Sequence, residues 1–158
     1  MDLVRTLATV VSLTASGPDT SSRAFVTMLG STTAKNEDLD SCYGSGHAAS
    51  WPATVTMRLY SANPMTGGVE IPTVNGYAGQ AITNNTTNFP AASGGQKSNG
   101  VAVTFTATGS GWSAVATYWW FTDGSGNLLD GGPLTAPLIM SGPASVTFPI
   151  GSIVIAVQ

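Results

Sequence analysis

Short runs of strand-forming residues, separated by turn-forming residues, constrain the fold of this chain more than any other feature. Its 158 residues include 19 glycines and nine prolines, which are poor in helix interiors and common in turns. The runs lack convincing helical periodicity, and about eight short strands divided by turns are typical of two packed sheets. The sequence therefore predicts one all-β domain over residues 1–158, a β-sandwich or jelly-roll-like fold with long loops. The expected strands are residues 23–29, 53–60, 77–83, 101–108, 113–121, 134–140, 145–148 and 152–157.

The N-terminal segment, residues 1–22, is compatible with more than one structure. Apolar positions over residues 3–14 fit the period of a strand and that of a helix. Residues 1–15 also have a weak likeness to a signal peptide, but Asp2 precedes the basic Arg5, and polar residues interrupt a short apolar run. We therefore expect no cleavage. We also expect no transmembrane helix, since no run reaches the roughly 18 apolar residues that a span needs.

Two long stretches, residues 30–50 and 84–99, have the composition of loops. Both are rich in glycine and polar residues and have almost no apolar pattern. Loops of this length are uncommon inside compact domains unless they bind something. Two interpretations stay open, namely contact with a partner and ordinary mobile loops. In the second stretch, Asn85 and Phe89 are candidate partner contacts.

Charged residues are scarce, at 8% of the chain against a typical share of about 25%. Exposed charge normally opposes association, so we expect a protein whose surface is packed against neighbours. The five lysines and arginines are scattered along the sequence. A nucleic-acid site needs several cations on one face, so we expect no nucleic-acid partner.

Few residues could support catalysis or hold a metal ion. Cys42 and His47 are the single cysteine and the single histidine, and both lie in one glycine-rich stretch. A flexible loop is a poor place to hold a nucleophile and base in contact, and tetrahedral zinc needs four ligands. Residues 123–130 begin with Asp-Gly, a common hairpin turn, and lack the spacing of a calcium loop. The sequence predicts no enzyme, no metal and no cofactor.

The aromatic run in residues 113–121 is the most informative strand. Alternation sends Trp119 and Phe121 to one face, and Tyr118 and Trp120 to the other. Because large rings occupy both faces, we expect one face to be covered by something beyond its own sheet. Tyr118 and Trp120 are therefore candidate partner contacts, and a sugar-binding platform is an alternative use of the same rings.

Six stretches of strand-and-turn sequence carry a resemblance to a known family. They are Arg58-Leu-Tyr-Ser-Ala-Asn-Pro64, Gly76-Tyr-Ala-Gly-Gln80, Val103-Thr-Phe-Thr106, Thr117-Tyr-Trp-Trp-Phe-Thr-Asp123, Gly126-Asn-Leu-Leu-Asp-Gly-Gly-Pro-Leu-Thr-Ala-Pro137 and Val146-Thr-Phe-Pro-Ile-Gly-Ser-Ile-Val-Ile-Ala156. In them the chain resembles phage virion proteins described as capsid cement (decoration) or tail-fibre-like proteins. Two features depart from that pattern: Trp120 stands where a small residue is usual, and residues 30–50 look like an addition.

The resemblance implies a structural protein of the virion, assembled in the bacterial host cytoplasm. Our leading hypothesis is a capsid cement protein, a homo-oligomer (dimer or trimer) that binds the major capsid protein and stabilises the outside of the shell. The alternative is a tail-fibre or baseplate component that holds other subunits or binds a glycan. A third class, a small hydrolase that uses Cys42 and His47, is the least favoured.

Overall fold

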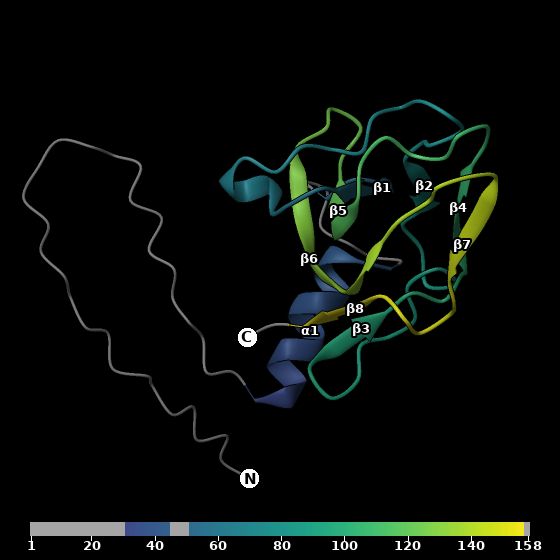
Figure 1. Ribbon diagram of the computed structural model, residues 1–158. Helices are drawn as coiled ribbons and strands as arrows, with labels where there is room; N and C mark the ends of the chain where they lie inside the picture. Colours follow the sequence, from purple (N-terminus) through teal and green to yellow (C-terminus); the bar gives the residue numbers. More distant parts are fainter. Residues whose placement is uncertain (1–30, 45–50, 157–158) are drawn as a thin grey trace, which may run out of the picture.

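A computed structural model describes residues 31–44 and 51–156 of the chain, which form an all-β, sandwich-like domain with one short helix (Figure 1). The fold class predicted from the sequence is therefore confirmed. The elements are, in chain order, α1 (Thr32–Cys42), β1 (Thr54–Tyr60), the 3-10 turn η1 (Pro64–Thr66), β2 (Gln80–Thr83), β3 (Gln96–Ser98), β4 (Val103–Ala107), β5 (Ala116–Thr122), β6 (Leu128–Leu138), β7 (Ala144–Phe148) and β8 (Val154–Ala156).

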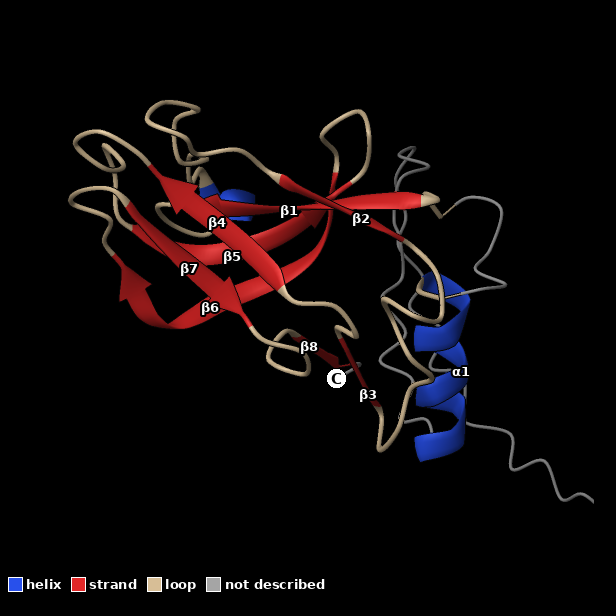
Figure 2. Cartoon of the chain, turned by 90° about the vertical axis from the view of Figure 1, so that its right-hand side faces the viewer, coloured by secondary structure: helices blue, strands red, loops and turns tan. Residues whose placement is uncertain are grey.

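The strands form two layers. One layer is a four-stranded sheet in the order β2-β1-β5-β6, and the other consists of the pairs β4-β7 and β3-β8. All of these pairings are antiparallel. Figure 2 shows β4 and β7 lying across β1, β5 and β6. A jelly roll has about eight strands built from two Greek keys, whereas within the described residues the second layer is two separate pairs.

The core lies between the layers and is rich in aromatic rings. β4 shows the predicted alternation, since Val103, Phe105 and Ala107 are buried while the threonines between them are exposed. Phe105 stacks on Tyr77 with ring centroids 5.9 Å apart. Burying apolar area in this way contributes roughly 25 cal/mol per Å² removed from water. The large side chains with under 2% exposure include Tyr43, Phe89, Phe105, Phe121, Met57, Leu59, Ile71 and Val55.

Most predicted strands have a counterpart, with differences at their ends. β6 begins at Leu128 rather than at residue 134, because it pairs with β5 directly after the turn and continues through two glycines and a proline. β2 begins at Gln80 rather than at residue 77, because Tyr77 instead hydrogen-bonds to β1: Leu59 N–H donates to its hydroxyl at 2.8 Å. The predicted strand 23–29 and the segment 1–22 lie outside the described residues.

The prediction of a loop over residues 30–50 is wrong in part, because α1 occupies this stretch. Ser31 caps the helix by accepting the Ala34 N–H at 3.3 Å, which satisfies one of the free donors at a helix start. Leu39 is the single buried residue of α1, so the sequence shows no apolar stripe. Contacts with β3 hold the helix to the domain.

Residues 84–99 are likewise not a free loop, because this segment contains β3 and is bonded to α1. Lys97 on β3 is 2% exposed, and its Nζ donates to Asp40 on the helix. The same Asp40 Oδ1 accepts the Ala92 N–H at 2.9 Å. Asn36 Oδ1 accepts the Gly95 N–H at 2.8 Å. The two stretches predicted to be loops therefore pack against each other. Within residues 31–44 and 51–156, no helix is long and apolar enough to span a membrane.

Candidate partner-contact surfaces

The outer face of the four-stranded sheet carries Tyr118 and Trp120, two of the four predicted contact residues. In the register between β1 and β5, Trp120 lies opposite Arg58, and Tyr118 lies opposite Tyr60. Neighbouring residues on β1 and β5, among them Phe121, point into the core, so these four side chains point away from it. As the sequence predicted, Tyr118 and Trp120 lie on one face of the sheet and Phe121 lies on the other.

Trp120 is mostly covered by its own sheet. Its side chain is 8% exposed. Its partner in β6 is Gly131, where an added Cβ would come within 2.6 Å of the indole Cδ2. The glycine thus leaves the space that the indole fills. The buried Nε1 has no hydrogen-bond partner in the described structure, an arrangement that costs free energy. Packing within the domain is therefore the main contact of this ring, and Tyr118, which is half-buried, keeps more open surface.

An ion pair on the same outer face fixes the chain that follows β1. Arg58 donates to both carboxylate oxygens of Glu70, at 2.8 and 3.0 Å, and its Nε donates to Thr122 Oγ1 at 3.1 Å. The hydrogen bond to Glu70 raises the pKa of Arg58 further above its usual value. Because Arg58 and Glu70 satisfy each other, neither carries a free charge on this face.

Asn85 and Phe89 hold the second loop-like segment in place. Asn85 Oδ1 accepts the N–H groups of Thr87 and Asn88 at 3.0 and 2.9 Å, and the residue is half-buried. Phe89 has no exposed surface, and its ring centroid lies 5.1 Å from that of Tyr43 and 5.8 Å from that of Phe121. In this fold the Phe89 side chain is part of the core and cannot touch a partner. Only its exposed neighbours in the segment are available for contact.

The structure separates the residues that were considered for chemistry. Cys42 is half-buried at the end of α1, and burial raises the pKa of its thiol, while His47 lies outside the described residues. Asp123 starts the predicted hairpin turn, which is confirmed, and it accepts the N–H groups of Ser125 and Asn127 at 2.8 Å each. Across residues 31–44 and 51–156, no three side chains of the types that bind metals lie together.

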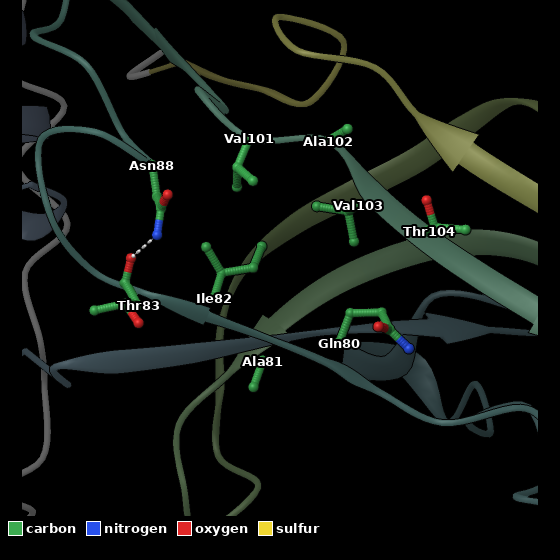
Figure 3. Close-up of a pocket in the computed structure, with 9 residues that line it drawn as sticks. All are labelled: Gln80, Ala81, Ile82, Thr83, Asn88, Val101, Ala102, Val103 and Thr104. Carbon is green, nitrogen blue, oxygen red and sulfur yellow. Dashed lines mark hydrogen bonds between the residues drawn. The ribbon is translucent and has the colours of Figure 1, made fainter.

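Two surface hollows lie between strands and are lined without charged residues. A pocket of about 210 Å³ opens between β2 and residues 101–104 (Figure 3). In it the Asn88 amide donates to the Thr83 carbonyl at 2.9 Å. Its volume is below the roughly 300–1,000 Å³ of most ligand sites. A groove of about 400 Å³ lies between β6 and the turn after β7. It combines the rings of Trp119 and Phe148 with the hydroxyl of Thr135.

A third surface, which we call the loop end, was not predicted from the sequence. It consists of residues 61–79, 108–115 and 139–143, which connect the strands at the end of the sandwich opposite α1 (Figure 2). Hydrogen bonds join these segments: Asn75 donates to the Gly111 carbonyl at 2.6 Å, and Trp112 N–H donates to the Met140 carbonyl at 2.7 Å. The loop end is therefore a bonded surface of the domain rather than a set of separate loops.

Apolar side chains are exposed at the loop end. Five of the eight exposed large hydrophobic residues of the described chain lie there: Met65 (71% exposed), Val69 (67%), Val74 (46%), Val115 (40%) and Ile139 (70%). Among its residues only Glu70 is charged, and it is paired with Arg58. Apolar exposure that is concentrated on one part of a surface is typical of interaction sites, so the loop end is a candidate contact surface. These residues lie on three separate connections between strands, so only the fold brings these connections to one end of the domain.

The chain was also compared with known proteins. A family model described as "Podophage GP4 fiber I protein gp80" matches residues 30–156, about four fifths of the 158-residue chain. The chain belongs to this fibre protein family. Its match begins at residue 30, so the segment that holds α1 is part of the family's own pattern rather than an addition to it. No curated protein matches the chain.

The family confirms that the chain is a phage structural protein, as the resemblance in six stretches had implied. The match covers every described strand and α1. The family match therefore includes all the residues that the structure describes, among them the outer sheet face and the loop end.

Proposed function

We propose that this chain is a structural component of a phage fibre and that it acts by binding other proteins of the particle. The observation that carries the proposal is the match of the fibre family to residues 30–156. Because the match covers the complete described domain rather than a short motif, the role belongs to the fold as a whole. It supports the fibre over the capsid shell, where our leading hypothesis from the sequence had placed the protein.

The surface of the domain supports binding to proteins. Protein interfaces are depleted in charged residues at their centres and surrounded by polar groups. The loop end has this composition, with exposed Met65, Val69 and Ile139 among serines, threonines and asparagines. Contacts of this kind gain strength when many copies act together in one particle.

We also propose that the chain acts without catalysis, and the titratable groups of the described residues support this. A catalytic cysteine needs a lowered pKa, whereas burial raises the pKa of Cys42. Burial also raises the pKa of Asp130, and the hydrogen bond from the Gly131 N–H opposes this only in part. General acid–base catalysis needs such a group to face a substrate site, and the lining of these two hollows contains no titratable residue. A third hollow of about 250 Å³ beside β3 is lined in part by Lys97, whose Nζ donates to Asp40.

A second candidate function is binding of a carbohydrate in the groove between β6 and the turn after β7. The indole of Trp119 and the ring of Phe148 offer stacking surfaces, and the Thr135 hydroxyl lies beside them. The volume of about 400 Å³ falls within the usual range for a small ligand. Binding of the purified chain to an array of bacterial surface glycans tests this candidate, with Thr135→Val as the variant that should weaken any signal.

Antibody labelling of intact particles, viewed by electron microscopy, tests the main proposal. The expected result is label on fibres at the tail. Label spread over the shell would instead support the cement role, and absence of the chain from purified particles would refute both. Mass spectrometry of separated tails and shells gives an independent measure of where the chain resides.

A further inference from the structure

We infer that Asn75 is a site of spontaneous covalent modification, at which its side-chain amide is lost as ammonia and an aspartyl or isoaspartyl residue forms. The inference goes beyond the proposed function, since it concerns a reaction of the loop end itself and not what the chain binds. It rests on the local fold around Asn75 and on the contrast with Asn99, the other asparagine that a glycine follows in the sequence.

The Asn75–Gly76 pair is required by the turn in which it lies. The Tyr77 N–H donates to the Val74 carbonyl at 3.1 Å and closes a turn around these two residues. Both have a positive φ, 50° at Asn75 and 82° at Gly76, as the central residues of a type I′ turn do. Asparagine and glycine adopt this conformation more readily than other residues. The turn therefore places a glycine directly after an asparagine.

A glycine in this position permits a reaction within the chain, because it has no Cβ to hinder its nitrogen. The Gly76 nitrogen loses its proton to a base in the solvent and attacks the side-chain carbonyl carbon of Asn75. The new C–N bond closes a succinimide ring, and the side-chain nitrogen takes up a proton and leaves as ammonia. One water molecule then opens the ring. Cleavage between the ring nitrogen and the side-chain carbonyl gives aspartate, and cleavage at the backbone carbonyl gives isoaspartate.

The nitrogen that attacks is available in the folded domain. Asn75 and Gly76 are both exposed, so water and base reach them. Among the described residues, no group accepts a hydrogen bond from the Gly76 N–H. The turn itself is held to the domain, because the Asn75 backbone carbonyl accepts the Thr108 N–H at 2.7 Å. The attacking group is therefore free within a turn that is otherwise bonded.

Asn99 has the same neighbour in the sequence and the opposite surroundings. It is 1% exposed, and its side chain makes three hydrogen bonds with backbone groups, each at 2.8 Å. The Gly100 N–H, which would have to attack, donates to the Asn88 carbonyl at 2.7 Å. The fold thus protects Asn99 and leaves Asn75 open to the reaction.

The modification breaks a link between two connections of the loop end. The Asn75 amide donates to the Gly111 carbonyl at 2.6 Å and to the Ser110 hydroxyl at 3.1 Å. These bonds restrict the side chain, so the reaction is slower than in an unfolded chain. A carboxylate has no hydrogen to donate, and its oxygen would face the Gly111 carbonyl oxygen without a bond, which is unfavourable. The product therefore adds negative charge and loosens the loop end.

Incubation of the purified full chain in mildly alkaline buffer, sampled over time, tests the inference. Trypsin cuts after Lys97, so Asn75 and Asn99 fall in different peptides. Tandem mass spectrometry locates the loss of each amide, and labelling by an isoaspartyl methyltransferase detects isoaspartate. In the folded chain Asn75 is expected to react at least tenfold faster than Asn99. In urea the two sites should react at similar rates, because a glycine follows both.

Asn75→Asp reproduces one of the two products and measures its effect on the domain. We expect its melting temperature to lie several degrees below that of the wild type. The matched control is Asn85→Asp, which adds the same charge. The bonds of the Asn85 side chain in the described structure are accepted by its oxygen, which a carboxylate also provides, so this variant should melt close to the wild type.

Two results would overturn the inference. One is an Asn75 that persists in the folded chain over the time in which the chain in urea is converted. The other is an equal rate at Asn75 and Asn99 in the folded chain. Equal melting temperatures of the two aspartate variants would refute the loosening of the loop end. The place of the chain in the particle enters none of these measurements, so they and the antibody labelling succeed or fail separately.

Discussion

Replacing Phe89 with alanine should strongly destabilise the domain, because the segment that carries it is part of the core. Phe89 has no exposed surface and contacts the rings of Tyr43 and Phe121. Replacing a fully buried phenylalanine with alanine costs about 3–5 kcal/mol in total, and the loss of two ring contacts, which stabilise beyond burial alone, places Phe89 in the upper part of that range. We therefore expect a loss of about 4–5 kcal/mol in the free energy of unfolding.

Urea denaturation followed by tryptophan fluorescence measures this loss, and thermal melting gives a second value. A loss of this size corresponds to a fall of roughly 10–20 °C in melting temperature for a domain of this length. The matched control is Thr87→Ala in the same segment, since Thr87 is exposed, and it should stay within about 0.5 kcal/mol of the wild type. Equal stability of Phe89→Ala and Thr87→Ala would show that residues 84–99 are a surface loop and that our reasoning is wrong.

Three further predictions concern the sheet and the attachment of α1. Trp120→Ala should lower the free energy of unfolding by about 3–5 kcal/mol in urea, because the indole is 8% exposed; weaker particle attachment at unchanged stability would instead make Trp120 an interface residue. Gly131→Ala should cost about 1–3 kcal/mol from overpacking, because an added Cβ would lie 2.4 Å from the Trp119 carbonyl oxygen and 2.6 Å from the Trp120 indole. Gly132→Ala, where an added Cβ meets nothing within 4 Å, should stay close to the wild type, and equal effects would refute this packing. The hydrogen bond from Lys97 lowers the pKa of Asp40, so this group contributes stability above its unfolded pKa of about 3.9 that is lost as the pH falls through its lower folded pKa. Asp40→Asn should therefore destabilise the domain at pH 7 and flatten the acid limb of a melting-temperature series, and an unchanged limb would contradict the assignment.

The strand-and-turn alternation was enough to predict the fold class and most strands. β4 shows why: its alternating residues Val103 and Phe105 form one buried face, and that pattern is local. The turn at Asp123 was also predictable, because its side chain bonds to the turn that it starts.

The helix and the attachment of residues 84–99 could not be predicted in this way. α1 has one buried residue, Leu39, so no apolar period marks it. Its contacts are made by Asp40 with Lys97 and Ala92, far away in the sequence. In the sequence, Phe89 is an isolated aromatic residue in a polar stretch. Only the positions of Tyr43 and Phe121 in the fold make it part of the core.

The candidate surfaces were predictable only in part, for a similar reason. Alternation placed Tyr118 and Trp120 on one sheet face, but the burial of Trp120 depends on Gly131 in the next strand. The exposed residues of the loop end, such as Met65 and Ile139, come from different connections between strands. Their gathering is a property of the antiparallel topology, which the sequence pattern does not specify.

A cryo-electron microscopy reconstruction of the intact particle tests the central claim most directly. We expect density for this domain in the tail fibres, with the two layers of the sandwich recognisable. Density for the domain on the capsid shell alone, or a complete particle that contains none of it, would contradict the account.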